Sequence, residues 1–204
     1  MMAKRKGLLL VMMEPPSGLE GEFNDWYDTE HFPQRRALPG FESASRWVCI
    51  AGWPRWAALY DLAGTDALAT PEYLMVSGAN STPWSRRILP RTIGRMRIVA
   101  EQLWPGESLT FAPEQVSRLL IARYRAMPMD WATDPVEQID KVAHQIPGLL
   151  QVRAFGSTGQ AETDLWVVAE YGRPVLPDPL TSAFAAVHGT GASLLNLYVP
   201  YLRA

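Results

Sequence analysis

The chain has 204 residues, 48% of them hydrophobic and 20% charged, with a formal net charge of −2. This length suits one large domain or two small ones and can bury a sizeable core. The 19 basic residues do not outnumber the 21 acidic ones, which disfavours nucleic-acid binding because phosphate neutralisation needs a basic excess. A single cysteine, Cys49, excludes an internal disulfide, so we expect a cytoplasmic protein.

The first predicted element is a buried strand over residues 8–13. Its apolar run follows Lys4-Arg5-Lys6, as in a signal peptide, but Glu14-Pro15-Pro16 stands where a cleavage site would have small residues. No apolar run approaches the length that spans a bilayer. We therefore expect no contact with a membrane.

An aromatic helix is predicted over residues 19–32. Phe23, Tyr27 and His31 recur every four residues, which places the imidazole within an apolar stripe. Pro33 lacks a backbone N–H and should end or restart this helix.

The first half continues with strands over residues 41–50, 56–62 and 95–103 and a second helix over 65–76. A loop rich in Ser, Pro and Arg, residues 80–91, precedes the last of these strands. Its length suits a lid or a clamp over an opening.

The second half shows the same order of predicted elements. Strands are expected over residues 118–125, 149–155, 165–171 and 194–201, and helices over 135–145 and 179–187. The motif Leu38-Pro39-Gly40-Phe41 recurs 108 residues later as Ile146-Pro147-Gly148-Leu149. We therefore expect an α+β fold of two tandem ferredoxin-like β-α-β-β-α-β units, residues 1–106 and 114–204, joined by a linker over 107–113. Their sheets would pack together as an intrachain α/β barrel.

Three features carry a family resemblance: the order of elements, the segment from Trp26 to Pro33 with the Leu-Pro-Gly-Phe that follows it, and the loop Ser85-Arg86-Arg87. Together they resemble the dimeric α/β-barrel superfamily, near its EthD-like branch. Most relatives are single ferredoxin-like units that dimerise, so the resemblance implies that this tandem chain corresponds to a fused dimer. The superfamily includes cofactor-free monooxygenases, lactone isomerases, polyketide cyclases, lyases and haem enzymes, so the activity must be argued from the site.

The repeat also compares the first helix of each half. In the second half the inward positions are apolar, as expected for a helix on a sheet, whereas the first half has polar groups there. Burying such groups without partners costs about 1–3 kcal/mol each, so we expect them to line a wet or ligand-filled space. The corresponding pairs are Asp28 with Val136, His31 with Ile139, Gln34 with Val142, and Arg35 with Ala143.

His31 is the candidate acid/base residue, because imidazole gains and loses a proton near neutral pH. Asp28, one turn earlier, is a candidate to orient the imidazole, and Tyr27 to donate a hydrogen bond to a substrate oxygen. The alternative interpretation is a satisfied core histidine with a carboxylate on the helix surface.

A second set of residues suits the binding of a flat, aromatic substrate. Strand aromatics offer pocket walls, although they more often form a core. Arginines near Trp84 offer a bidentate clamp for a carboxylate or phenolate, although such a loop is as readily solvated. The substrate-binding candidates are Arg35, Trp47, Trp56, Tyr60, Tyr73, Trp84, Arg86 and Arg87.

Other chemistries lack their motifs. The three histidines are too scattered for a local metal motif, and one cysteine cannot form a thiolate cluster, so we expect no metal site. Phosphate-binding loops and the Gly-x-Ser-x-Gly motif are also absent from the sequence. His188, before Gly189, is interpreted as a residue at a helix end.

The sequence therefore favours a cofactor-independent enzyme of the lyase, isomerase or cyclase type. Its substrate would be a small hydrophobic molecule, aromatic or polyketide-like, with His31 as general acid/base. One alternative is a monooxygenase, cofactor-free or haem-dependent, since a single axial histidine needs no motif. Another is a non-catalytic binding or assembly protein. The sequence leaves a homodimer open.

Overall fold

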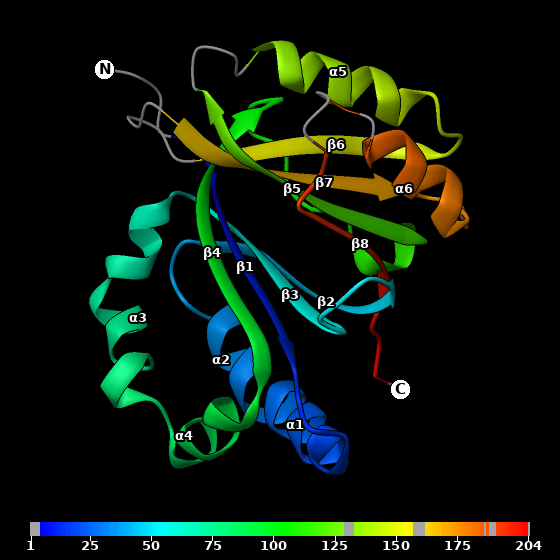
Figure 1. Cartoon of the computed structure of the whole chain (residues 1–204). Helices are drawn as coiled ribbons and strands as arrows, with labels where there is room; N and C mark the ends of the chain where they lie inside the picture. The colour runs from blue at the N-terminus through cyan, green and yellow to red at the C-terminus, as the bar shows by residue number, and fades with distance from the viewer. Residues whose placement is uncertain (1–4, 129–132, 157–161, 186, 188–190, 204) are drawn as a thin grey trace.

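A computed structural model describes residues 5–128, 133–156, 162–185, 187 and 191–203. In this part of the chain, eight strands close into one antiparallel barrel in the order β1-β3-β2-β8-β5-β7-β6-β4 (Figure 1). Each strand lies where the sequence predicts one. The strands are β1 (Gly7–Glu14), β2 (Phe41–Ala51), β3 (Trp56–Leu62), β4 (Ile93–Trp104), β5 (Arg118–Pro128), β6 (Leu149–Gly156), β7 (Glu162–Tyr171) and β8 (Leu194–Pro200).

The two halves of the chain contribute neighbouring groups of strands. The first four lie in the order β4-β1-β3-β2 and the last four in the order β8-β5-β7-β6. Two seams close the barrel, one between β2 and β8 and a shorter one between β4 and β6. Every pairing is antiparallel, and the same relative order of strands occurs in both groups.

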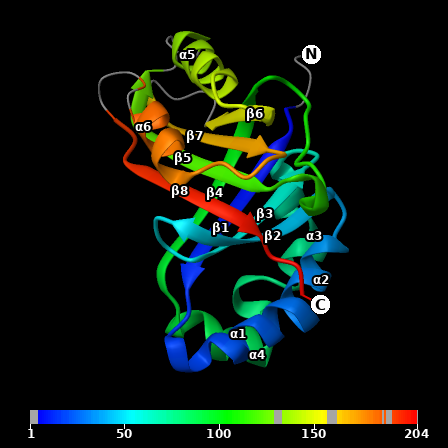
Figure 2. The same cartoon turned by 90° about the vertical axis from the view of Figure 1, so that its right-hand side faces the viewer.

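The helices cover opposite outer faces of the barrel, as the two perpendicular views show (Figures 1 and 2). Those of the first half are α1 (Glu20–Trp26), α2 (Phe32–Arg36), α3 (Pro71–Leu74) and α4 (Pro83–Ile88). Those of the second half are α5 (Thr133–His144) and α6 (Pro177–Ala185). No described helix has the length and apolarity needed to cross a bilayer.

Strand β1 is buried on both faces, and its successive side chains point in opposite directions. In β1, Leu8 and Leu10 belong to the core inside the barrel, while Leu9 packs toward the helices of the first half. The interior core also takes Ile121 and Phe155 from the second half. The near-continuous apolar run of β1 follows from this two-sided burial.

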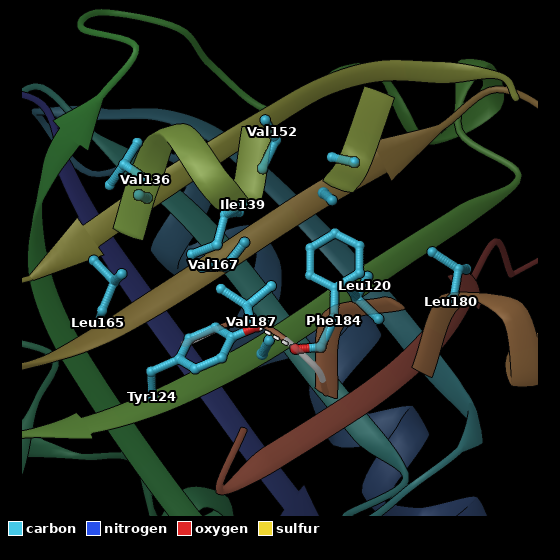
Figure 3. Packing of buried hydrophobic residues seen from close by; sticks show 14 of the residues in the cluster. Leu120, Tyr124, Val136, Ile139, Val152, Leu165, Val167, Leu180, Phe184 and Val187 are labelled. Carbon is cyan, nitrogen blue, oxygen red and sulfur yellow. Dashed lines mark hydrogen bonds between the residues drawn. The ribbon is translucent and has the colours of Figure 1, made fainter. Parts of the chain in front are cut away.

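The outer core of the second half is filled with apolar side chains. Val136 and Ile139 of α5 pack against the sheet beside Phe184 of α6 (Figure 3). The Tyr124 hydroxyl donates a hydrogen bond of 2.7 Å to the Phe184 carbonyl, which satisfies a polar atom inside this core. The apolar stripe predicted for this helix is therefore confirmed at these positions.

A π-helical turn over Tyr27–His31 joins α1 to α2. The Phe32 amide donates to the carbonyl of Tyr27, five residues earlier, and Pro33 then lies in the first turn of α2. In the first turn of a helix a backbone N–H has no partner within the helix, so the missing N–H of Pro33 removes no hydrogen bond there. The helix therefore continues to Arg36. The expected second helix is likewise corrected to a 3₁₀ segment over Thr65–Ala69 followed by α3.

The repeated Pro-Gly motif serves the same purpose in both halves. Gly40 precedes β2 with φ +80°, and Gly148 precedes β6 with φ +91°. This left-handed conformation favours glycine, because a Cβ strains it. At Gly40 a Cβ would also approach the Cβ of Ala67 to 2.8 Å.

A buried polar cluster holds the segment that connects the two halves. Arg153 donates to the Asp61 carboxylate at 2.7 Å and to the Thr110 hydroxyl at 2.7 Å. The Thr110 amide donates to Asp61 at 2.6 Å, and Gln151 donates to the Leu109 carbonyl at 2.6 Å. We call residues 108–111 the strap, because these bonds fasten it across strands from both halves.

Candidate functional site

A cavity of about 570 Å³ lies between the sheet of the first half and the segments α2, α3 and the ends of α4. We call it the helix cavity. Its floor is apolar and comes from alternate residues of β1, and its walls come from α2, α3, β3, β4 and the segments around α4. The lining residues are Leu9, Val11, Met13, His31, Arg35, Tyr60, Tyr73, Ser77, Gly78, Ser81, Leu89, Arg95 and Arg97.

His31 lies at the end of the π-helical turn and lines the helix cavity. Its ring packs on Trp26, with ring centroids 4.5 Å apart, and edge-on against Tyr27 at 5.1 Å. The Nδ1 atom is buried without a hydrogen-bond partner among the described residues. Burial lowers the pKa of His31 to about 3, helped by the positive charges of Arg35 and Arg46, so the imidazole is neutral near pH 7.

Tyr60 brings a second unpartnered polar atom to the helix cavity. Its side chain is 1% exposed, and its hydroxyl lies beside that of Tyr27 but forms no hydrogen bond of full geometry with any described residue. Burial raises the pKa of Tyr60 well above its ordinary value, so the phenol keeps its proton. A protonated phenol is a hydrogen-bond donor, and such a group suits an oxygen atom of a ligand.

Tyr27, predicted to donate to a substrate, is adjacent to the cavity residue Tyr60, with whose hydroxyl its own interacts. It is 3% exposed and is not among the residues that line the helix cavity. Its ring packs between His31 and the Arg46 guanidinium, whose central carbon is 4.3 Å from the ring centroid. Tyr27 therefore supports His31, and the phenol that lines the cavity is that of Tyr60. The role of Tyr27 toward a substrate stays a prediction.

Arg35 brings a buried positive charge to the helix cavity. The side chain is 6% exposed and donates to the Val76 carbonyl at 2.7 Å and to the Gln34 amide oxygen at 3.0 Å. Its guanidinium lies 5.5 Å from the ring centroid of Tyr73. The Tyr73 hydroxyl in turn accepts a hydrogen bond of 3.1 Å from Arg97 on β4.

Asp28 does not orient His31, which corrects a second prediction. Its carboxylate forms an ion pair with Arg46 and accepts hydrogen bonds from Tyr201 at 3.1 Å and Arg203 at 3.2 Å. It lines a different hollow of about 680 Å³ between β2, residues 109–114 and the chain end at 201–203, which we call the tail groove. In a regular helix residues 28, 31 and 35 share a side, but the π-helical turn advances each residue by a smaller angle. Asp28 and His31 thus diverge.

Trp47 and Trp56 form core rather than cavity wall, which corrects their assignment to substrate binding. Trp47 is 0% exposed inside the barrel, where its indole donates to Ser45 at 2.8 Å. Trp56 is 5% exposed beneath α1 and packs edge-on against Tyr201. Strand alternation points Trp47 into the barrel, whereas Trp56 shares the helix-facing side of β3 with Tyr60 but lies beneath α1 instead of at the cavity.

The loop arginines bind the protein itself instead of clamping a ligand. Arg87 forms an ion pair with Glu22 of α1, and Trp84 donates to the same carboxylate at 3.1 Å. Arg86 is exposed and donates to the Ala79 carbonyl at 3.4 Å. The loop folds into α4, and its contribution to the cavity comes from its ends, at Ser81 and Leu89.

Two cavity arginines were missed by the sequence interpretation. Arg95 and Arg97 lie on the helix-facing side of β4, while the alternate residues Met96 and Ile98 pack toward the barrel interior. The alternation in Arg95-Met96-Arg97-Ile98 is the signal that could have found them, since it marks a strand with one polar face.

The remaining histidines give no second site among the described residues. His144 is exposed on α5, where its Nδ1 lies 2.8 Å from the Asp140 carbonyl oxygen. His188 falls outside the described residues. Among the residues that are described, no three His, Cys, Asp or Glu side chains gather in a way that could hold a metal ion.

Comparisons with known proteins identify the type of fold. No protein-family model matches the sequence, and no curated protein matches it. An anthrone oxidase-like protein is similar in structure, with a TM-score of 0.63 and 10% identity over 98% of this chain and 93% of that one. A chlorite dismutase variant from Candidatus Nitrospira defluvii gives a TM-score of 0.58 and 12% identity over 98% and 93%. A haem-binding protein from Thermus thermophilus gives a TM-score of 0.52 and 12% identity over 98% of this chain and 92% of that one. The fold is of the dimeric α/β-barrel type.

Proposed function

We propose that the chain is an enzyme that transforms a small hydrophobic molecule in the helix cavity, in a lyase, isomerase or cyclase type of reaction. The observation that carries this proposal is the pair of unpartnered buried polar atoms, His31 Nδ1 and the Tyr60 hydroxyl, on residues that line one cavity. Buried polar groups normally have partners, so such a pair suits a ligand that supplies them. The apolar floor suits an aromatic or polyketide-like body.

The proposed chemistry follows from the two groups. His31 takes a proton from a carbon next to a carbonyl group of the substrate, and the Tyr60 hydroxyl donates a hydrogen bond to the oxygen on which negative charge develops. His31 then returns the proton to another atom. A pKa of about 3 makes the imidazole a weak base in the free protein, because burial disfavours its charged form and the positive charges of Arg35 and Arg46 add to that effect. Negative charge on the bound substrate offsets these arginines and strengthens the base.

A mass-resolved turnover assay tests this proposal. Small aromatic ketones, lactones and phenols are incubated with the wild type, with His31→Gln and with the exposed control His144→Gln. We expect products of unchanged mass, or of lower mass with release of a fragment, and a loss of about 10²–10⁴-fold in turnover for His31→Gln alone. Equal turnover by the wild type and His31→Gln would contradict the proposal.

A cofactor-free monooxygenase is the second candidate. The similarity to an anthrone oxidase-like protein favours it, and the same cavity groups suit it, since they would stabilise a substrate anion able to react with oxygen. The assay separates the candidates. A product that has gained one oxygen atom and lost two hydrogens, formed only in air and with oxygen uptake, identifies the monooxygenase, because without an external reductant the second oxygen atom leaves as water.

A haem-dependent reaction fits the cavity residues less well. A ligating histidine normally donates its second ring N–H to a carboxylate, a carbonyl or water, which fixes the ring. His31 Nδ1 has no such partner among the described residues. A Soret band in freshly purified protein would show that haem binds and would contradict this argument against a haem-dependent reaction.

We also propose that the chain arose as two fused ferredoxin-like copies near the EthD-like branch, with residues 107–113 as the join. The matching strand orders β4-β1-β3-β2 and β8-β5-β7-β6 support the duplication, and so do Gly40 and Gly148 at equivalent turns. A homodimer of the whole chain remains part of this proposal.

A further inference from the structure

The helix cavity is rich in positive charge that no carboxylate balances. Arg35, Arg95 and Arg97 line it, and none of its described lining residues is acidic. None of these arginines forms an ion pair with a described carboxylate, in contrast to Arg46 and Arg87 of the same half. Three uncompensated guanidinium groups at one cavity attract an anion.

Arg35 carries most of the argument, because it is buried. An ionised group inside a protein is costly unless a counter-charge or several hydrogen bonds compensate it. Arg35 has two neutral acceptors, Val76 and Gln34, which leave further N–H donors of its guanidinium available. These acceptors and the Tyr73 ring hold the group in place at the cavity before any ligand arrives.

Tyr73 links this inner charge to the mouth of the cavity. Its ring lies beside Arg35 and stacks on Phe41 at a centroid distance of 6.1 Å, while its hydroxyl accepts from Arg97. Arg97 is exposed, so an incoming ligand meets it first. Beside Arg97 in the sheet, Leu9, Val11 and Met13 of β1 offer an apolar surface that an inorganic anion would leave unused.

We propose that the ligand of the helix cavity is a small organic carboxylate with an aromatic body, its carboxylate bound between Arg35 and Arg97 and its body on the β1 floor. This inference rests on the proposed function and adds the charge class of the substrate. The guanidinium fork matches a carboxylate with two parallel hydrogen bonds. The same negative charge lies near His31, where it opposes the positive charges of Arg35 and Arg46 that add to the effect of burial on the imidazole.

Binding of three probes to the full chain tests the inference. The probes are 2-naphthoate, its neutral isostere 2-naphthamide and inorganic phosphate, with affinity measured by calorimetry and the His31 ring observed by nuclear magnetic resonance. We expect 2-naphthoate to bind and to shift the His31 signals, and the other two probes to bind at least tenfold more weakly. Equal binding of the amide, or of phosphate, would overturn the inference.

Variants locate the charge. Arg97→Gln should weaken 2-naphthoate binding about tenfold, and Arg35→Gln more, whereas Arg86→Gln, an exposed arginine outside the cavity, should change it less than twofold. Arg97 is at the surface, so Arg97→Gln decides the question even if Arg35→Gln fails to fold. An unchanged affinity in Arg97→Gln would contradict the inference.

The outcomes also separate the two proposals. If the amide binds as well as the acid and shifts His31, the carboxylate inference fails while the cavity stays a ligand site for the proposed function. If neither 2-naphthoate nor 2-naphthamide shifts the His31 signals, the helix cavity binds no aromatic ligand of this size, and the proposed function fails together with the inference.

Discussion

The surroundings of His31 decide what its imidazole can do. Trp26 and Tyr27 pack against the ring, and the nearby charges are those of Arg35 and Arg46, both positive. The carboxylate expected to assist it is held instead in an aromatic cage with Arg46, whose guanidinium lies 4.4 Å from the Tyr201 ring centroid. His31 is therefore a neutral group that depends on a ligand for its partner.

Asp28→Asn should destabilise the protein without abolishing turnover or binding in the helix cavity. The change leaves Arg46, 4% exposed, without its carboxylate, although Asn24 still accepts one hydrogen bond at 2.8 Å. We expect a loss of roughly 2–3 kcal/mol in the free energy of unfolding, somewhat less than for a fully buried pair. Urea unfolding measures it.

Asp25→Asn provides the matched control for this change. Asp25 is 52% exposed and pairs with Arg203 at 2.6 Å, so its loss should cost less than about 1 kcal/mol. A stable Asp28→Asn protein without turnover would return Asp28 to the catalytic role that the sequence suggested.

At the scale of elements, the strap is held by charges that are fully buried. Arg153 and Glu170 are 0% exposed and Asp61 is 1% exposed. Arg153 bonds to the Asp61 carboxylate and lies 3.8 Å from Oε1 of Glu170, an oxygen without a hydrogen bond among the described residues. The Glu170 carboxylate also accepts a hydrogen bond from Gln151. Burial raises the pKa of Glu170 from 4.5 to about 7, against the opposing effect of Arg153. A proton on Glu170 leaves the cluster neutral.

Glu170→Gln should therefore remove a pH dependence of stability. Between pH 4.5 and about 7 the folded protein holds the Glu170 proton more tightly than the unfolded chain, so this residue makes stability fall as pH rises through that window. Above pH 7 the variant should be more stable than the wild type by up to about 3 kcal/mol.

Urea unfolding at pH 5 and pH 8 tests this expectation, with Glu114→Gln as the control because Glu114 is an exposed carboxylate beside the strap. A difference between wild type and Glu170→Gln that does not grow from pH 5 to pH 8 would refute the assignment.

At the scale of the whole molecule, the barrel interior belongs to both halves. Leu8, Leu10 and Trp47 of the first half meet Ile121 and Phe155 of the second in one core. The seams β2–β8 and β4–β6 add hydrogen bonds across the same boundary. Each half thus covers an apolar sheet face of the other.

Residues 1–106 expressed alone should self-associate, because their sheet face would lose its cover of second-half side chains. Light scattering after size-exclusion chromatography measures the mass. A folded monomer of this fragment would show that the interior face is stable in water and would weaken the proposed duplication from a dimerising unit.

The sequence by itself determined the elements. A strand that is buried on both sides requires an apolar run, as in β1. A helix that packs on a sheet requires an apolar stripe, as at Val136 and Ile139. A left-handed turn favours glycine, as at residues 40 and 148. These are local or periodic constraints, so a single chain displays them. They placed every strand and drew attention to His31.

Only the tertiary structure decided which groups share the cavity. The π-helical turn separated Asp28 from His31, and strand faces sent Trp47 inward while they turned Arg95 and Arg97 toward α2. Arg87 forms an ion pair with Glu22, which lies 65 residues away in sequence. Such contacts depend on small rotations of a helix and on segments distant along the chain, and spacing in sequence carries no record of either.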